Sequence, residues 1–420
     1  MQCSREHRKS RVSPPLVSLP ASGESQLYTP LTFGDVAGEH SPALKGRYAM
    51  RETGAELSPS KAVRLCGRRA RLFGSSSSGG VSLWARGDSL SFSGLLRCNS
   101  VWQCPVCAPR IMQDRAEALR MLWERHAESS GAVLLITLTA PHEYGNDLKP
   151  LRRHVSGAWR RVVSGAPWVR WKAKHKVLGF VRALEVTHGL NGWHPHLHAL
   201  IYFEGKAPPL AEVQSWFFSR WASAFTQGTA WPAPSREHGV RVSAPKAGDY
   251  LAKMGLAAEL ALSHTKEGRK VNRTPWQILR DLTNRKGDRA ALARDTRLWS
   301  EWANAMKGAR QLTVSRELRL RYPHAQQLEL ELEAQTELPE SGAEEVASWS
   351  PAEWEDIARA DVRGTWRVAA LSLWRYPRAL WRTLLVRWEC ELLGLPYPDA
   401  ANVGDIYRQT SPPLEDRAAA

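Results

Sequence analysis

The 420-residue sequence has few cysteines and no long apolar run. A membrane-spanning helix needs about 18 or more consecutive apolar residues, and no stretch approaches that length, which excludes an integral membrane protein. The first ten residues are basic, but no apolar segment follows them, so we expect no secretory signal peptide and a cytoplasmic location. Six cysteines are too few for a disulfide scaffold, and clustered cysteines in a reducing compartment are interpreted first as metal ligands.

Acidic side chains are scarce relative to basic ones. Lys and Arg number 58 against 42 Asp and Glu, which gives a net charge of +16. The imbalance is uneven, because residues 325–420 hold 17 acidic and 9 basic side chains and residues 1–324 therefore carry +24. Solubility alone needs only a modest net charge. A basic body of this size indicates a polyanionic partner, with nucleic acid as the first candidate.

Composition divides the chain into segments of different character. Ser, Pro and Gly dominate the beginning, and ten acidic residues without any Lys or Arg occupy Leu328–Asp356. The predicted segments are a disordered or loosely packed arm (1–60), a basic cysteine-rich segment and helix (61–130), an α+β domain (131–265), a helical extension (266–324), an acidic linker (325–358) and a small helical C-terminal module (359–420).

Hydrophobic periodicity over residues 132–262 predicts the order β-α-β-β-α-β followed by a helix. The expected strands are 132–140, 179–187, 195–203 and 240–243, and the expected helices are 148–163, 210–227 and 248–262. This order is typical of the split, ferredoxin-like arrangement, in which an antiparallel sheet carries helices on one face. The predicted fold class is therefore α+β.

The run HPHLH over residues 194–198 is the sharpest chemical signal. Alternation along a strand puts its three histidines on one face, where His196 and His198 could bind one divalent cation. A hairpin centred between residues 190 and 191 would place Glu185 opposite His196, as the expected third ligand. A carboxylate on an otherwise apolar strand needs such a partner. The alternative is a polar strand face that only meets solvent.

Tyr250 and Lys253 form a second candidate pair. Residues i and i+3 share a face of a helix, so the ammonium group could stabilise a phenolate and activate the tyrosine as a nucleophile. YxxK alone is a weak motif, and a core tyrosine beside a surface lysine is the simpler interpretation. The pair gains weight from its position on the helix expected after the last strand.

The cysteines form a third group. Cys104-Pro105-Val106-Cys107 is typical of a zinc knuckle, in which two thiolates bind one tetrahedral ion. Cys98 lies close by and Cys66 lies upstream, so the four could form a structural zinc site. Scattered cytosolic thiols are the alternative.

With these motifs in order, the sequence resembles single-tyrosine plasmid replication initiators of rolling-circle type, within the HUH endonuclease superfamily. The resemblance spans about residues 62–320. The blocks that carry it are LLITLTAPH (134–142), GWHPHLHALIYF (192–203), DYLAK (249–253), RTPWQIL (273–279), WSEWANAMKGARQLTVSRELR (299–319) and the cysteine segment.

The resemblance implies an HUH endonuclease domain over residues 131–265 and a metal-dependent DNA nickase. Mg²⁺ or Mn²⁺ on Glu185, His196 and His198 would polarise a phosphodiester of single-stranded origin DNA. Tyr250, assisted by Lys253, would attack it to give a 5′-phosphotyrosine and a free 3′-OH. A host helicase and a DNA polymerase are the partners that it implies.

One departure concerns termination. Relatives of this type usually carry a glutamate four residues before the tyrosine, and this chain has Lys246 there. A transposase or mobilisation relaxase on the same fold is the nearest alternative. A metallohydrolase that uses HPHLH without the tyrosine is a second, and a DNA-binding protein that has lost its chemistry is a third.

Overall fold

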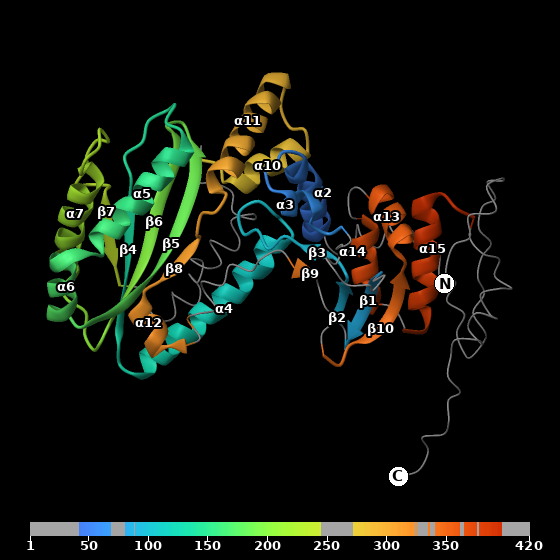
Figure 1. The fold of residues 1–420 in the computed structure, drawn as a ribbon, viewed down its shortest axis with the longest axis horizontal. Helices are drawn as coiled ribbons and strands as arrows, with labels where there is room; N and C mark the ends of the chain where they lie inside the picture. Colours follow the sequence, from blue (N-terminus) through green and yellow to red (C-terminus); the bar gives the residue numbers. More distant parts are fainter. Residues whose placement is uncertain are drawn as a thin grey trace, which may run out of the picture. The chain divides into compact units, whose positions relative to one another are not determined.

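The structure is a computed structural model of the whole chain. It describes residues 42–68, 80–87, 89–244, 272–323, 325, 335–336, 341–361, 365–375 and 378–396. Tyr250, Lys253 and the helix predicted over 248–262 lie outside the described residues. The chain divides into two compact units (Figure 1): unit 1 comprises 1–49, 67–96 and 336–420, and unit 2 comprises 50–66 and 97–335.

A five-stranded antiparallel sheet forms the centre of unit 2. Its strand order is β7-β4-β6-β5-β8, and every neighbouring pair is antiparallel. The strands are β4 (Ala132–Thr139), β5 (Val177–Gly189), β6 (Gly192–Phe203), β7 (Val240–Ser243) and β8 (Leu312–Val314). The predicted α+β class with an antiparallel sheet is therefore confirmed. Strand β8 falls where only helix was predicted, because three residues are too few to show a period.

Helices of unit 2 cover both faces of this sheet. The described helices that lie wholly in unit 2 are α3 (Lys61–Leu65), α4 (Cys107–Glu128), α5 (Leu148–Val162), α6 (Gly165–Lys174), α7 (Leu210–Thr226), α10 (Pro275–Thr283), α11 (Arg289–Met306) and α12 (Arg316–Arg321). Helix α2 (Pro42–Glu56) begins in unit 1 and ends in unit 2, within the segment predicted as a loose arm. Helix α10 begins at a capping box, in which Thr274 and Gln277 satisfy each other's backbone amides.

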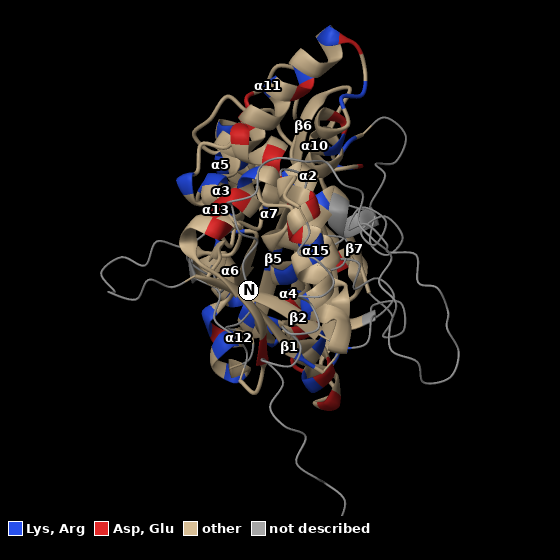
Figure 2. Cartoon of the chain, turned by 90° about the vertical axis from the view of Figure 1, so that its right-hand side faces the viewer, with Lys and Arg blue, Asp and Glu red and all other residues tan. Residues whose placement is uncertain are grey.

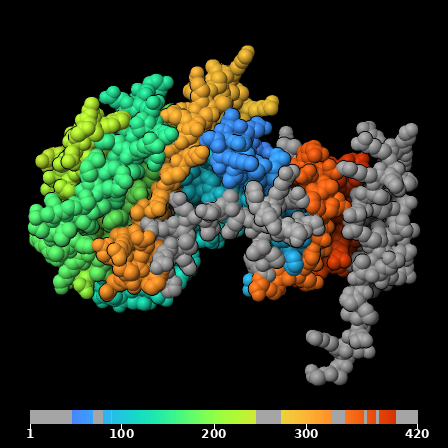
Figure 3. Space-filling view, viewed as in Figure 1, coloured from blue at the N-terminus to red at the C-terminus, as the bar shows by residue number. Residues whose placement is uncertain are grey.

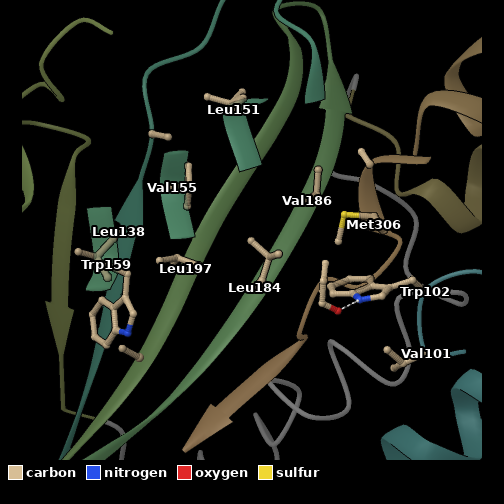
Figure 4. Close-up of a cluster of buried hydrophobic side chains, with 14 of the residues drawn as sticks. Val101, Trp102, Leu138, Leu151, Val155, Trp159, Leu184, Val186, Leu197 and Met306 are labelled. Atoms are coloured by element: carbon tan, nitrogen blue, oxygen red, sulfur yellow. Dashed lines mark hydrogen bonds between the residues drawn. The ribbon is translucent and has the colours of Figure 1, made fainter. Parts of the chain in front are cut away.

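Helix α5 illustrates how the sequence builds the first face. Its apolar residues recur every three or four positions, and all of them are buried. Leu151 and Val155 pack against the sheet face that carries Leu197 (Figure 4). The second face is also covered over part of its length, because Leu119 and Leu122 of α4 pack against Leu200. The expectation of helices on one face only was therefore wrong.

The β5–β6 hairpin has the predicted register, with Glu185 opposite His196. Its turn is shorter than predicted, since Gly189 and Gly192 still pair. Gly192 has φ +83°, in the left-handed region that glycine adopts without strain.

Unit 1 is a three-stranded sheet with helices from the C-terminal part of the chain. The strands, in the order β10-β1-β2, are β1 (Val81–Arg86), β2 (Ser89–Ser93) and β10 (Glu344–Trp349). The helices are α13 (Pro351–Ala360), α14 (Thr365–Leu371) and α15 (Trp381–Leu393), with 3-10 turns at Leu373–Arg375 and Arg378–Leu380. The two-residue strands β3 (Leu96–Arg97) and β9 (Gln335–Thr336) lie where the chain passes from one unit to the other.

Strand β10 lies within the segment predicted as an acidic linker. Val346 and Trp349 are buried, whereas Glu344 and Glu345 are exposed. The strand therefore buries its large apolar side chains and leaves its acidic side chains in solvent. Trp349 joins an aromatic cluster with Phe92 of β2. Two apolar residues among many acids give too weak a pattern to predict a strand from composition.

Candidate metal centres and comparison with known proteins

Glu185, His196 and His198 come together on one face of the unit 2 sheet. The Glu185 Oε2 atom lies 3.2 Å from the Nε2 atom of each histidine. The side chains are 25%, 15% and 13% exposed respectively, so the group is recessed but open to a ligand. One ligand atom from each residue lies within 4.8 Å of the others. Strand alternation and hairpin register are sufficient to bring Glu185 to His196 and His198, which lie eleven and thirteen positions further along the chain.

Neighbouring groups orient this cluster. Thr137 of β4 lies opposite His198, and its Oγ1 atom is 3.2 Å from the His198 Nδ1 atom. This contact leaves Nε2 directed at the carboxylate. Burial alone would raise the pKa of Glu185, but hydrogen bonds with His196 and His198 hold it well below its usual range. The cluster therefore presents an ionised carboxylate beside two imidazoles.

His194 is on the same strand face but outside the set of three. Its ring centroid is 5.2 Å from that of His196 and 4.5 Å from that of His142. Burial, followed by the charge of the neighbouring histidines, lowers the pKa of His194 to about 3, so its ring is neutral near pH 7. This position agrees with an expected outer role rather than with that of a ligand.

The donor set fits a divalent cation. Two imidazole nitrogens and a carboxylate oxygen are common ligands, with bonds of about 2.0–2.2 Å that leave roughly 3 Å between neighbouring ligand atoms. The 3.2 Å separations match that spacing. Three protein ligands would leave further coordination positions open to other oxygen atoms.

The four predicted cysteines form a second centre in unit 2. Cys66, Cys98, Cys104 and Cys107 are all buried, and their sulfur atoms lie within 4.8 Å of one another. The measured Sγ–Sγ distances of 3.5, 3.6 and 3.8 Å are far longer than the ~2.05 Å of a disulfide. A tetrahedral zinc ion with ~2.3 Å bonds would space its sulfurs about 3.8 Å apart. The four sulfurs can therefore hold a zinc ion.

Backbone amides support the cysteine cluster. The amide of Ser100 donates to the Cys98 sulfur at 3.5 Å, and that of Cys107 donates to the Cys104 sulfur at 3.4 Å. Hydrogen bonds with the neighbouring thiols, followed by burial, raise the pKa of Cys104. A raised pKa favours the neutral thiol, so four thiols this close together would lose their protons together only to a cation, which a bound metal would supply.

Helix α11 and the residues that follow it join the cysteine segment to strand β6. The indole of Trp102 donates to the Ala309 carbonyl at 2.7 Å, and the indole of Trp302 donates to the Trp102 carbonyl at 3.2 Å (Figure 4 shows the first bond). On its other side, the Trp302 ring stacks on Trp193, one residue before His194. A continuous chain of contacts therefore connects the two candidate metal centres.

Arg273 holds the α10–α11 hairpin against β5, a role that sequence reasoning missed. Its backbone exchanges two hydrogen bonds with His188, three residues from Glu185. Its guanidinium group binds both carboxylate oxygens of Asp295, at 2.6 and 2.7 Å, and also Asp281 at 3.2 Å. The available signal in the sequence was one arginine just before two helices that carry acidic residues.

Replacing Arg273 with alanine is expected to lower the free energy of unfolding by about 3 kcal/mol, because the carboxylate of Asp295 is only 4% exposed and would keep only a 3.7 Å contact with the exposed Arg294. Chemical denaturation followed by circular dichroism measures the change. Asp281→Asn is the matched control and should cost about 1 kcal/mol or less, since the side chain of Asp281 is 27% exposed and its distance to Arg273 is longer, at 3.2 Å. Equal losses in both variants would contradict the assigned role.

The fold and the two centres define an α+β protein with a histidine–glutamate cluster on its sheet and a four-cysteine cluster beside it. A family profile described as "Replication protein" matches residues 95–359. The chain belongs to this family of replication proteins.

Individual relatives agree with the family. A protein named "Protein rep" from Streptomyces lividans is 28% identical over 302 residues, which cover 57% of this chain and 66% of that protein. A "Protein rep" from Bacillus sp is 34% identical over 101 residues, covering 23% of this chain and 31% of the relative. The chain thus spans less than two thirds of the length of these relatives. No solved structure is significantly similar to the chain. In the part of the chain that the structure describes, no helix is long and apolar enough to cross a membrane.

Proposed function

We propose that the chain is a rolling-circle replication initiator that nicks and rejoins single-stranded origin DNA. The observation that carries this proposal is the convergence of Glu185, His196 and His198 on one strand face, in a chain of the replication protein family. The order β7-β4-β6-β5 supports the split βαββαβ arrangement expected of an HUH endonuclease. Such a protein binds DNA, in keeping with its net charge of +16.

Glu185, His196 and His198 would hold Mg²⁺ or Mn²⁺, which would polarise the scissile phosphate and neutralise charge on it. The Tyr250 oxygen, its proton lost to solvent, would form a bond to phosphorus, while the bond from phosphorus to the 3′ oxygen breaks and that oxygen takes up a proton from solvent. The product would be a 5′-phosphotyrosine with a free 3′-OH that primes synthesis. Lys253 would stabilise the phenolate. Thr137 would keep the His198 ring oriented through its 3.2 Å contact.

Zinc on the four cysteines would have a structural role. It would fix the segment that contacts α11 through Trp102, and so support the strand that carries His196 and His198. The basic residues around this segment, such as Arg64 and Arg110, would face DNA. A host helicase would separate the strands, and a DNA polymerase would extend the free 3′-OH.

The experiment that tests the proposal is a covalent trapping assay. Purified protein is mixed with single-stranded origin DNA and Mn²⁺ and run on a denaturing gel, beside Tyr250→Phe and an EDTA control. We expect a protein–DNA adduct that requires both the tyrosine and the metal. Cleavage that persists in Tyr250→Phe would instead indicate a metallohydrolase. An adduct formed on transposon ends or a transfer origin, but not on a replication origin, would indicate a transposase or relaxase.

A further inference from the structure

Strand β7 places one arginine beside the histidine–glutamate cluster. Arg241 lies opposite Thr137 in the β4–β7 ladder, and Thr137 lies opposite His198 in the β4–β6 ladder. Residues directly opposite in antiparallel strands project from the same face of a sheet. Arg241, Thr137 and His198 therefore form one row across three strands, on the face that carries the cluster.

The spacing of this row suits contact with a bound strand of DNA. Neighbouring strands lie about 4.8 Å apart, so the backbones of Arg241 and His198 are separated by roughly 10 Å. A long arginine side chain can cover much of that distance. A phosphate next to the one held at the cluster would lie within its reach.

Arg241 differs from its neighbours in charge and exposure. The flanking residues Val240 and Val242 are buried, whereas Arg241 is exposed. It is the one Lys or Arg on this face among the described strand residues of the sheet. Glu185, the carboxylate of the same face, is already engaged by both histidines. The described part of the chain offers Arg241 no ion-pair partner.

We propose that Arg241 binds a backbone phosphate of the single-stranded DNA, adjacent to the phosphate that is cleaved. A guanidinium group can donate two parallel hydrogen bonds to phosphate oxygens, which would fix the register of the strand over the cluster. The proposal rests on the proposed function, because the strand it positions is the one that is nicked. Arg241 is thus a substrate-binding residue, on the strand that precedes the predicted nucleophile by nine positions.

Binding is measured first, in a Tyr250→Phe background with Mn²⁺, by fluorescence anisotropy of labelled oligo(dT). Arg241→Ala is expected to weaken binding about fivefold at 0.1 M salt and to reduce the slope of log K against log salt by about 0.7, the value for one phosphate of a single strand. Arg241→Lys should recover most of that slope, because it keeps the charge. Arg153→Ala is the matched control, since Arg153 is exposed on α5, which packs on the opposite sheet face. It should bind within twofold of the parent protein.

A second measurement separates a direct contact from a structural effect. Origin strands that carry one neutral methylphosphonate at successive positions around the cleaved bond are bound to the parent protein and to Arg241→Ala. We expect one position at which the neutral group weakens the parent and leaves Arg241→Ala unchanged. Equal sensitivity of the two proteins at every position, or an Arg241→Ala affinity equal to that of Arg153→Ala, would overturn the proposal. Absence of the covalent adduct would count against the nicking function alone, since these binding measurements do not depend on cleavage.

Discussion

Replacing His198 with alanine is expected to lower the rate of strand cleavage at least about 1000-fold, because a metal that stabilises developing charge contributes several kcal/mol. The His198 Nε2 atom is one of three ligand atoms in the cluster and lies 3.2 Å from Glu185. With only two ligands left, the site would bind its cation weakly. Single-turnover cleavage of origin DNA over a range of Mn²⁺ concentrations measures both the rate and the apparent metal affinity.

The control variant lies on the same strand. His194→Ala removes an imidazole from the same face, but His194 is outside the set of three ligand atoms. We expect it to reduce cleavage by less than about tenfold, because it supports His196 rather than binding the metal. If His198→Ala cleaves DNA as fast as His194→Ala at every Mn²⁺ concentration, then His198 is not a metal ligand.

Local patterns predicted the histidine–glutamate cluster because a hairpin is a local structure. Once the turn is located at Leu190 and Asn191, the register follows by counting, and Glu185 must face His196. The period of two then decides which side chains share a face. The cysteine cluster was predictable for a similar reason, since the CPxC turn brings two of its four sulfurs together locally.

The unit 1 sheet could not be predicted in this way. Strand β1 pairs with β10, some 260 positions further along the chain, and Val81 faces Trp349. The hydrophobic pattern of a short segment contains no information about a pairing with a strand so far along the chain. The described residues of 360–393 do contain helices α14 and α15, as their periodicity predicts, whereas the serine-rich strand β2 lay in the predicted cysteine-rich segment and the acidic strand β10 in the predicted linker.

Ion pairs between residues far apart in the chain also could not be predicted from the sequence. Arg273 and Asp295 are 22 positions apart, and the hairpin of α10 and α11 makes them partners. Figure 2 shows how widely Lys and Arg are distributed over the chain, so charge alone does not single out a functional residue. Figure 3 shows α10 and α11 as a contiguous gold surface. Composition alone does not tell which charged residues of this region form pairs. Arg241 was identifiable only when both ladders of β4 were known.

The second prediction with a large expected effect concerns the cysteine cluster. Replacing Cys104 with serine is expected to abolish stoichiometric zinc binding and to lower the free energy of unfolding by about 4–5 kcal/mol. Each kcal/mol shifts the midpoint of thermal unfolding by about 2–4 °C, so the midpoint should fall by roughly 10 °C or more. Cys104 is fully buried between Cys66 and Cys107, so a serine hydroxyl would replace a strong zinc ligand by a weak one. Zinc content by mass spectrometry and unfolding by circular dichroism measure the two effects.

The loss should extend beyond the cysteine segment because of its contacts with α11. Gln103, next to Cys104, donates to the Ala303 carbonyl at 2.9 Å, and Trp302 stacks on Trp193 at the start of β6. We therefore expect Cys104→Ser to reduce DNA cleavage even below its unfolding temperature. Ser58→Ala is the control, since it removes the 2.6 Å hydrogen bond to Gln103 and the 3.1 Å bond from the Ser60 amide, and should cost about 1–2 kcal/mol with zinc retained. Full cleavage activity in a zinc-free Cys104→Ser protein would show that the two centres are independent.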